Sequence, residues 1–423
     1  MSSAVPSTGL STWLSPMEVS ACCDRHGDSF YVFHEGVFKK NFVALLDAFT
    51  RCYPNTKIAY SYKTNYTPAV CELVDRLGGY AEVVSEMEFN LARRLGIEGP
   101  RIVFNGPCKS LRSIRDALEC GALINIDSVR DYENIQSVAA TMPNREMVVG
   151  IRCNFPMEAR ELSRFGIDVK TDDFRRVVDA IRASKNLTLG GVHCHFPDRD
   201  LESFRQRTIG LIEVVRDVFS EGPAFIDIGG GLFGDLPNSL RKLYQTSPPT
   251  YSEYGEVVGR LCADAFGNSA HPPLLFIEPG TGLVANTFRF YTRVLDVRSV
   301  AGRRIATVAG SIQNISPHAR STRLPVEVLA QTAKAASRQE EEVDIAGYTC
   351  MESDYLTKGL RQHVDVGDVL EYANVGSYSI VMKPPFILPN VPILMISNDS
   401  RVPRVIRYEE DSMALFQSFV AAG

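Results

Sequence analysis

The feature that most constrains this chain is a repeated alternation of short apolar runs with helical patterns. The runs are rich in β-branched residues, as strands buried on both faces are; they are Lys57–Lys63, Tyr80–Ser85, Arg101–Gly106, Leu123–Ser128, Met147–Asn154, Leu189–Phe196, Ala224–Gly230 and Leu274–Gly280. Amphipathic helical stretches lie between them, among them Pro68–Leu77, Glu86–Leu95, Ser110–Glu119, Phe174–Ser184 and Leu201–Phe219. Eight β-then-α units in about 240 residues match the size of a (β/α)8 barrel. A doubly wound open sheet is the competing fold, because periodicity alone does not separate the two.

The pattern changes after about Phe290, where helical periodicity gives way to alternating Thr, Val and Tyr. Further strands are predicted within residues 288–300, 302–310, 367–382 and 391–397, and near the N-terminus over residues 29–38. We therefore predict an α/β protein with three regions. They are an N-terminal segment (1–40) that joins the β domain, a barrel (41–290) and a C-terminal β domain (291–423).

The composition limits the possible classes of function. The chain has 45 Lys and Arg against 50 Asp and Glu, so it has no basic field with which to hold nucleic acid. No apolar run is long enough to span a membrane, and we find no secretory signal at the N-terminus. The ten cysteines are scattered without a CxxC pair, so we expect no metal site and reduced thiols. We therefore expect a cytoplasmic protein.

Polar residues close most of the predicted barrel strands. Chemistry in this class of barrel lies at the C-terminal ends of the strands. The residues found there are Lys63, Asn105, Asp127, Arg152, Asn154, His193, His195, Gly229–Gly231 and Glu278. Each has an ordinary explanation when taken alone, such as a solvated charge, a satisfied polar group or a tight turn. Their shared place on one face of one barrel favours a functional site.

These residue types suit one cofactor. A lysine at a barrel mouth can form a Schiff base with an aldehyde. Three consecutive glycines expose backbone N–H groups to a phosphate, and an imidazole can stack on a pyridine ring. A carboxylate such as Glu278 can bond to a protonated ring nitrogen. Together they predict pyridoxal 5′-phosphate as the cofactor.

The order of the motifs resembles that of the fold-type III pyridoxal-phosphate decarboxylases. This family includes ornithine, lysine, arginine and diaminopimelate decarboxylases and has a barrel of alanine-racemase type. The resemblance covers roughly residues 30–395. It rests on YSYKTN (60–65), VVSEMEF (83–89), FNGPCKS (104–110), INIDS (124–128), LSRFGI (162–167), GVHCHF (191–196), IDIGGG (226–231), EPG (278–280), TCMESDYL (349–356) and NVGSYS (374–379).

The resemblance implies a role for individual residues. Lys63 is the lysine that binds the cofactor, His195 stacks on its ring, and Glu278 meets its ring nitrogen. The other cofactor-binding residues that it implies are Gly229, Gly230, Gly231, Gly280, Thr281 and Tyr378. Cys350 of one subunit completes the site of the other, which implies a homodimer with shared active sites. Cys350 would then act as the general acid that protonates Cα after CO₂ has left.

Several departures from the family pattern bear on the cofactor and the substrate. Pro197–Asp198 replaces a Gly-Ser pair that helps to bind phosphate, and Thr281 replaces an arginine. Met351 stands where ornithine-type enzymes have an acidic residue that binds the distal amine, and residues 309–311 carry no charge. The candidates for substrate binding are Met351, Glu352, Asp354, Arg320 and Arg323.

We therefore predict decarboxylation of a small amino acid, with release of CO₂ and an amine. The expected substrate is a diamino acid or a modified, conjugated or D-configured derivative, in polyamine or siderophore biosynthesis. Diaminopimelate also fits, since its distal end carries a carboxylate. Two alternatives stay open: an amino-acid racemase on the same fold, which usually has an arginine in place of Glu278, and a non-catalytic homologue that regulates a partner. Phe165 and Phe196 are candidates for an apolar lining around the departing carboxylate.

Overall fold

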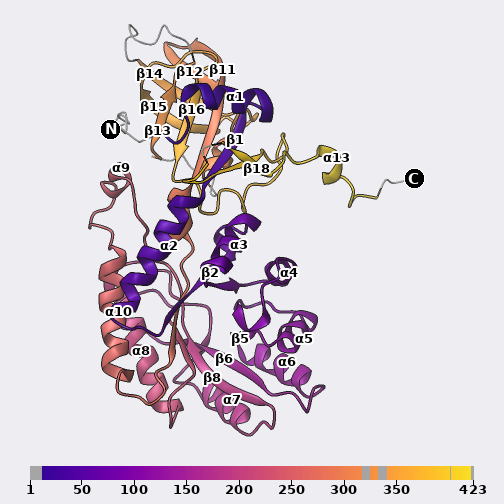
Figure 1. Ribbon diagram of the computed structural model, residues 1–423, viewed down its shortest axis with the longest axis vertical. Helices are drawn as coiled ribbons and strands as arrows, with labels where there is room; N and C mark the ends of the chain where they lie inside the picture. The colour runs from indigo at the N-terminus through magenta and orange to yellow at the C-terminus, as the bar shows by residue number, and fades with distance from the viewer. Residues whose placement is uncertain (1–11, 317–323, 332–340, 401, 421–423) are drawn as a thin grey trace. The chain divides into compact units, whose positions relative to one another are not determined.

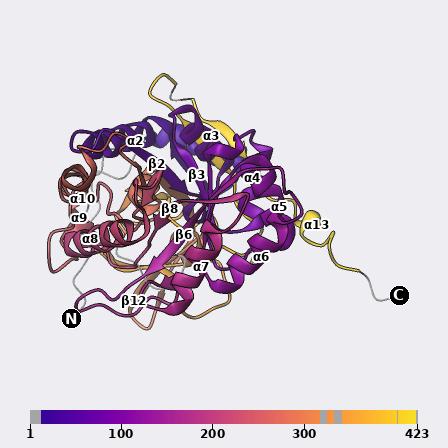
Figure 2. The ribbon, with the colours of Figure 1, turned by 90° about the horizontal axis from the view of Figure 1, so that it is seen from below.

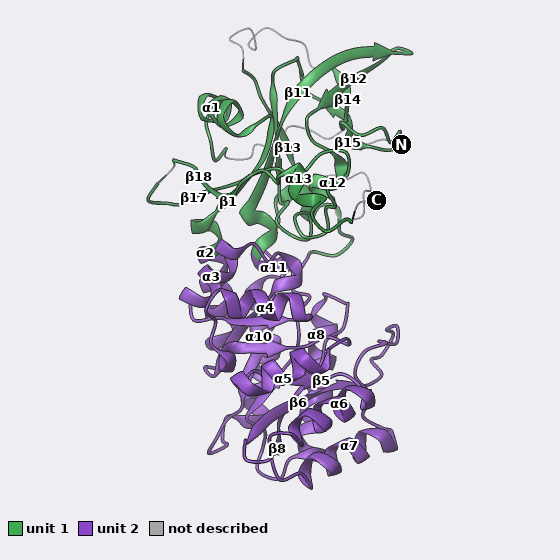
Figure 3. Ribbon diagram, turned by 90° about the vertical axis from the view of Figure 1, so that its right-hand side faces the viewer, with its two compact units in different colours: residues 1–38, 236–247, 284–423 green, residues 39–235, 248–283 purple. Residues whose placement is uncertain are grey.

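The computed structural model describes residues 12–316, 324–331, 341–400 and 402–420. The chain divides into two compact units, coloured separately in Figure 3. Unit 1 comprises residues 1–38, 236–247 and 284–423, and unit 2 comprises residues 39–235 and 248–283.

Unit 2 is built around a closed parallel barrel. Its strands are β2 (Thr56–Ser61), β3 (Tyr80–Val83), β4 (Ile102–Phe104), β5 (Leu123–Ile126), β6 (Met147–Asn154), β7 (Ile167–Asp168), β8 (Leu187–His193), β9 (Phe225–Asp227) and β10 (Leu274–Ile277). Among the described residues they follow the order β5-β4-β3-β2-β10-β9-β8-β6-β7, and a further β5–β6 pairing closes all but β7 into a ring. This closure confirms the predicted (β/α)8 barrel and excludes the open sheet.

Helices surround the ring of strands, as Figure 2 shows with the barrel in the centre. They are α2 (Glu35–Thr50), α3 (Pro68–Arg76), α4 (Glu86–Arg94), α5 (Leu111–Cys120), α6 (Val129–Ala139), α7 (Asp172–Arg182), α8 (Leu201–Val218) and α10 (Tyr251–Phe266), with short 3₁₀ turns η1 (Tyr62–Thr64) and η2 (Gly99–Arg101). Several helices begin at a polar residue whose side chain accepts a hydrogen bond from the first turn, as Ser85, Ser128 and Asp200 do. Such caps satisfy free backbone N–H groups and hold the loops at the barrel mouth.

Unit 1 contains one mixed β-sheet. Its strands are β1 (Ser29–His34), β11 (Phe288–Val300), β12 (Arg303–Val308), β13 (Val326–Leu329), β14 (Glu342–Ala346), β15 (Tyr355–Arg361), β16 (Val369–Ala373), β17 (Ile393–Ile396) and β18 (Arg404–Arg407). The main order is β15-β14-β12-β11-β1-β17-β18, with β16 pairing to β11 and β13. Figure 1 shows the indigo β1 beside the orange β11, although they are far apart in the sequence. The short helices α1 (Pro16–His26), α9 (Asn238–Arg241), α12 (Ile312–Ile315) and α13 (Ser412–Leu415) complete this unit, with the 3₁₀ turn η3 (Ala285–Thr287), while α11 (Thr281–Val284) spans the boundary between the units.

The strand predicted over residues 29–38 was wrong at its end. β1 stops at His34, and Glu35 begins helix α2. The reason lies in the residues that follow, since Phe38, Phe42 and Leu45 are buried and recur at helical spacing. No helix in the described part of the chain combines the length and apolarity that a membrane span requires.

Candidate active site

Polar side chains meet in one cavity at the C-terminal end of the barrel strands. The cavity measures about 290 Å³. It is lined by Lys63, Glu82, Val84, Asn105, Gly106, Pro107, Arg152, Arg164, Phe165, His193, His195 and Glu278. These residues lie near or after the C-terminal ends of different strands, so only the closed barrel brings them together. The predicted residues Lys63, His195 and Glu278 are among them.

Lys63 is held at one side of this cavity. It lies in the 3₁₀ turn η1, directly after β2, and its side chain is 36% exposed. Its Nζ lies 2.7 Å from Oε2 of Glu82 and 2.6 Å from Oγ of Ser61. Ser61 donates a further hydrogen bond to the same carboxylate. The amine is therefore both anchored and reachable by a small molecule.

Asn105 links two carboxylates that line the cavity, those of Glu82 and Glu278. Its Nδ2 donates to Oε1 of Glu278 at 2.5 Å and to Oε1 of Glu82 at 3.1 Å. Its own Oδ1 accepts a hydrogen bond of 2.8 Å from Nδ2 of Asn125. The orientation of Asn105 is thus fixed by partners on both sides, and it fixes the position of Glu278 in turn.

Glu278 lies in a buried group of acidic and imidazole side chains. Its Oε2 is 3.5 Å from Nε2 of His193, and Asp227 lies close by with no exposed surface. Burial raises the pKa of Asp227 well above its usual range, and the charge of Glu278 raises it further. Burial alone would raise the pKa of Glu278 too, but His193, Lys63 and the hydrogen bond from Asp227 hold it below its usual range. Burial and charge therefore favour the protonated form of Asp227 and the ionised form of Glu278.

His193, Asp227 and Glu278 also lie within 4.8 Å of one another, near enough to share a metal ion. The sequence predicted no metal site. A protonated Asp227 is a poor metal ligand, whereas one fixed carboxylate at Glu278 suits a protonated ring nitrogen. The donor set therefore fits a pyridine ring.

The glycines after β9 form a tight backbone cradle beside His195. Gly229 and Gly231 have positive φ angles of 71° and 95°, which L side chains rarely adopt. A Cβ on Gly230 would lie 2.1 Å from the carbonyl oxygen of Glu278, so no side chain fits there. The N–H of Gly230 donates to Nδ1 of His195 at 3.0 Å. Close-packed backbone of this kind fits a phosphate group.

His195 is neutral in this setting. Burial lowers its pKa well below the usual range, and the charges of Lys63 and Arg207 lower it further. Because Nδ1 accepts the hydrogen bond from Gly230, the proton of the imidazole resides on Nε2. A neutral ring with a fixed tautomer suits stacking on an aromatic cofactor.

The EPG segment also depends on a glycine. A Cβ on Gly280 would lie 2.0 Å from Oγ1 of Thr64, next to Lys63 in the chain. The N–H of Ser61 donates to the carbonyl oxygen of Pro279 at 3.2 Å. The ends of β2 and β10 are thereby locked together, and Thr281 follows as the first residue of α11.

The carboxylate of Asp198, which replaces a phosphate-binding residue of the family, is paired with an arginine. Oδ1 of Asp198 lies 3.2 Å from Nη1 of Arg160, and Asp200 accepts from Nη2 of the same arginine at 2.7 Å. The carboxylate of Asp198 is therefore held in an ion pair with Arg160, which it shares with Asp200.

The cysteine motif lies in unit 1, where its loop is held by a buried acid. Asp354 accepts hydrogen bonds from Oγ1 of Thr349 at 2.7 Å and from the N–H of Ile312 at 2.8 Å. Cys350, Met351 and Glu352 are exposed on this loop. Asp354 thus orders the loop, and its predicted part in substrate binding stays a prediction.

One other predicted residue, Tyr378, also falls outside the barrel. Tyr378 belongs to unit 1, where it is half-buried and has a positive φ of 64°. Arg320 and Arg323 lie outside the described residues.

Several residues that line the cavity or lie beside it were not among the predicted site residues. Glu82 and Asp227 sit inside strand-like apolar runs, and each is almost fully buried. A charged residue within such a run was the available signal, because a buried charge needs a partner. The only sequence signal for Arg164 was its place in the LSRFGI motif.

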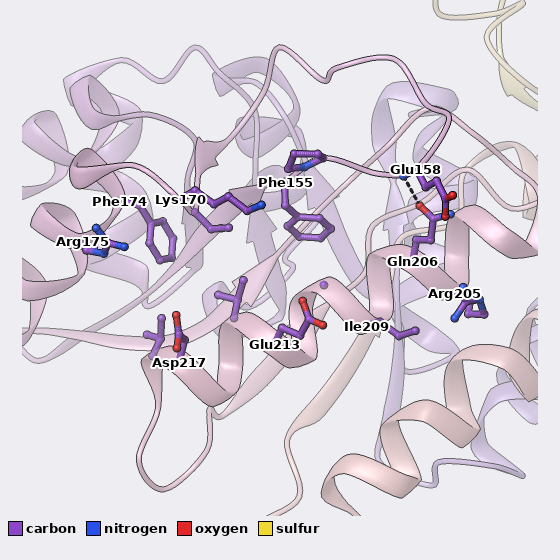
Figure 4. Close-up of a pocket in the computed structure, with 15 residues that line it drawn as sticks. Phe155, Glu158, Lys170, Phe174, Arg175, Arg205, Gln206, Ile209, Glu213 and Asp217 are labelled. Carbon is purple, nitrogen blue, oxygen red and sulfur yellow. Dashed lines mark hydrogen bonds between the residues drawn. The ribbon is translucent and has the colours of Figure 1, made fainter.

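A larger hollow lies elsewhere, on the outer face of the barrel. It measures about 850 Å³ and is lined by residues of α7, α8 and the loop after β6. Figure 4 shows Phe155, Phe174, Arg205 and Glu213 around it. None of the predicted site residues lines this hollow, so size does not identify the active site here.

Known proteins resemble this chain in sequence. Residues 39–285, more than half of the chain, match the family model described as "Pyridoxal-dependent decarboxylase, pyridoxal binding domain". The chain is 28% identical over 411 residues to a probable chloroplastic diaminopimelate decarboxylase of Oryza sativa subsp. japonica, covering 93% of this chain and 80% of that protein. It is 23% identical over 405 residues to the diaminopimelate decarboxylase of Aquifex aeolicus (strain VF5), covering 91% and 90%.

Solved structures resemble the whole chain. The crystal structure of diaminopimelate decarboxylase from M. jannaschii in complex with L-lysine matches with a TM-score of 0.84 and 23% identity, covering 96% of this chain and 94% of that one. At this level of identity the structural likeness supports the fold: a barrel with a second β unit.

Proposed function

This chain belongs to the pyridoxal-dependent decarboxylases, and we propose that its substrate is a diamino acid with a second carboxylate, of which 2,6-diaminopimelate is the simplest. It is a pyridoxal 5′-phosphate-dependent amino-acid decarboxylase, a carbon–carbon lyase. The proposal rests above all on one observation: the Lys63 amine, the Glu278 carboxylate and the Arg164 guanidinium line the same cavity.

The cofactor, when bound, draws off the electron pair left on Cα as CO₂ departs. Lys63 is the amine that holds it, and Glu82 orients that amine through the 2.7 Å contact. Glu278 supplies a fixed negative charge for the ring nitrogen, while the neutral His195 offers an apolar ring face. Gly231 would offer its backbone N–H to the phosphate, since the N–H groups of Gly229 and Gly230 already donate to Asp227 and His195.

The charges around the cavity favour a substrate with two carboxylates. Arg152 is already paired with Asp127 at 2.9 Å, and its guanidinium lies 4.7 Å from the ring centre of Phe165. Arg164 lies 4.0 Å from the same ring and has no ion pair in the described part of the chain. A cation bound to the departing carboxylate would stabilise the ground state and slow its loss. Arg164 therefore suits the carboxylate that stays.

The relatives support the same substrate class. The proteins compared above are named diaminopimelate decarboxylases, and one holds L-lysine, the compound that remains when diaminopimelate loses one CO₂. Lysine biosynthesis is then the proposed context, in place of polyamine or siderophore biosynthesis. The comparisons support neither a racemase nor a non-catalytic homologue.

Cys350 is the proposed acid that returns a proton to Cα. The loop that carries it is ordered by Asp354 and leaves the thiol exposed on unit 1. Such a loop is suited to enter the site of a second copy, so a homodimer with shared sites forms part of the proposal.

The test is CO₂ release by the cofactor-loaded protein from a panel of substrates. The panel contains meso-diaminopimelate, L-lysine, L-arginine, L- and D-ornithine and a citryl-diaminopropionate conjugate. We expect release from meso-diaminopimelate, with lysine as product and no release from Lys63→Ala. Arg164→Met should raise KM for meso-diaminopimelate about 10-fold or more, as expected when a charge-assisted hydrogen bond is lost.

Other outcomes would revise the proposal in defined ways. Equal kcat/KM for L-lysine and meso-diaminopimelate, unchanged in Arg164→Met, would overturn the assignment of the second carboxylate. Exchange of the Cα hydrogen with solvent and no CO₂ release would favour the racemase. Cofactor binding with neither activity would favour a non-catalytic homologue.

A further inference from the structure

A buried arginine lies behind the glycine cradle. Arg207 comes from the middle of α8, and its side chain has no exposed surface. Its guanidinium donates to the carbonyl oxygens of Gly230 at 2.9 Å and Asp198 at 2.8 Å. Longer hydrogen bonds reach the carbonyl oxygens of Phe196 at 3.2 Å and Ile228 at 3.4 Å. Arg207 therefore joins the segment after His195 to the glycines after β9.

No carboxylate in the described part of the chain contacts the guanidinium of Arg207. Within the described residues it forms no ion pair, and its Nε has no hydrogen-bond partner. The carboxylates of Asp198 and Asp200 contact Arg160 instead, and their charges reach Arg207 only from a distance. Burying a guanidinium among neutral partners is costly, and burial lowers its pKa accordingly. A negative charge from outside the chain would relieve that cost.

The direction of the peptide groups shows on which side of the two segments such a negative charge would lie. A peptide unit is planar and trans, so its N–H points away from its C=O. The carbonyls of Gly230 and Asp198 point at Arg207, and the N–H groups of Gly231 and Arg199 therefore point to the opposite side. In the described part of the chain the Gly231 N–H has no hydrogen-bond partner. A Cβ on Gly231 would lie 3.7 Å from the carbonyl oxygen of Asp198, which places the two segments side by side.

We propose that Arg207 is a positioning residue for the cofactor phosphate. It turns the backbone of both segments so that N–H groups face the phosphate, and the phosphate balances its buried charge. This assigns a source of positive charge in a chain where Thr281 and Pro197–Asp198 lack the usual phosphate contacts. The inference rests on the pyridoxal 5′-phosphate dependence and not on the proposed substrate, so failure of diaminopimelate as substrate leaves it standing.

The test compares two ligands that differ only in the phosphate. Apoprotein is titrated with pyridoxal 5′-phosphate and with pyridoxal, and each Kd is read from the absorbance of the Lys63 adduct. The measured quantity is the ratio of the two Kd values, which expresses the preference for phosphate. Because both ligands are measured on the same variant, a general weakening of the fold cancels in the ratio.

Two variants separate charge from hydrogen bonding. Arg207→Gln keeps a donor for the loop carbonyls but removes the charge, whereas Arg207→Lys keeps the charge. We expect Arg207→Gln to reduce the preference for phosphate about 30-fold, the size expected for loss of one charged partner. Arg207→Lys should retain most of it. The control is Arg205→Gln on the same helix, where Arg205 is half-exposed, pairs with Glu202 at 2.8 Å and lies by the outer hollow of Figure 4.

The result that would overturn the proposal is equally defined. An unchanged ratio in Arg207→Gln would mean that Arg207 only ties the two segments together. An equal fall in Arg207→Lys and Arg207→Gln would show that the charge does not matter. A fall of the same size in Arg205→Gln would mean that any charge on α8 has this effect.

Discussion

Glu88 should make the stability of this protein depend on pH. It lies on α4, is 4% exposed, and accepts a hydrogen bond of 2.8 Å from the N–H of Val84. Burial raises its pKa from 4.5 to about 7; the hydrogen bond from Val84 opposes this rise, and the charge of Glu82 adds to it. Between these two pH values the folded chain holds a proton that the unfolded chain has released. The contribution of Glu88 to stability is therefore complete below pH 4.5 and is lost as the pH rises to about 7.

The magnitude follows from the same pKa values. One pKa unit corresponds to about 1.4 kcal/mol, so the loss between pH 5 and pH 8 amounts to about 2 to 3 kcal/mol. Glu88→Gln resembles the protonated acid and keeps an acceptor for the N–H of Val84. The free energy of unfolding of Glu88→Gln, relative to that of wild type, should therefore rise by about that amount from pH 5 to pH 8. Urea unfolding of the apoprotein measures it.

The matched control is Glu86→Gln, which makes the same change in the first turn of the same helix. Glu86 is partly exposed and bonds to Oγ of Ser110 at 2.6 Å. The difference in free energy of unfolding between Glu86→Gln and wild type should be nearly the same at pH 5 and pH 8. If the stability difference between Glu88→Gln and wild type were also the same at pH 5 and pH 8, Glu88 would be ionised in the folded chain and the reasoning would fail.

Further predictions concern the cavity and its supports. Gly230→Ala should weaken binding of pyridoxal 5′-phosphate about 10-fold or more, because the added Cβ would lie 2.1 Å from the carbonyl oxygen of Glu278. Titration of the apoprotein tests this, and an unchanged Kd would contradict it. Glu278→Gln should lower kcat about 100-fold or more while the cofactor still binds, since the fixed charge is lost; steady-state CO₂ release measures it, and a full kcat would refute the role of the carboxylate. Lys109→Met should destabilise the chain by about 3 to 5 kcal/mol, since it leaves Asp131, 2.7 Å from the Lys109 Nζ, as a buried unpaired charge. The double variant Lys109→Met/Asp131→Leu should recover part of that loss in urea unfolding, and no recovery would show that the pair is not coupled.

The barrel and its cofactor could be predicted because both depend on local patterns. Strands buried on both faces read as continuous apolar runs, and helices between them show their own period, so the series of β-then-α units followed from these patterns. The order of the motifs indicated the family, and the β5–β6 pairing then separated the closed barrel from the open sheet. The predicted strand over residues 29–38 failed at Glu35, where the apolar residues that follow change from strand spacing to helical spacing. The helical spacing of Phe38 and Phe42 can be recognised only over a stretch of sequence longer than the strand itself.

The partners of the buried charges could not be predicted in the same way. Glu82 and Asp227 belong to different strands and Glu278 follows a third, and they interact only because the sheet closes into a ring. Which of two carboxylates keeps its proton depends on burial and on neighbours far away in the sequence. No motif contains that information.

The sequence by itself determined the period of the strands and helices, the order of the motifs and the kinds of groups placed at the barrel mouth. The tertiary structure alone decided how the charges are shared, with Asp198 bound to Arg160 and Arg207 left without a carboxylate. The physical reason is that periodicity is a local property of the chain, whereas electrostatic compensation depends on distances in space.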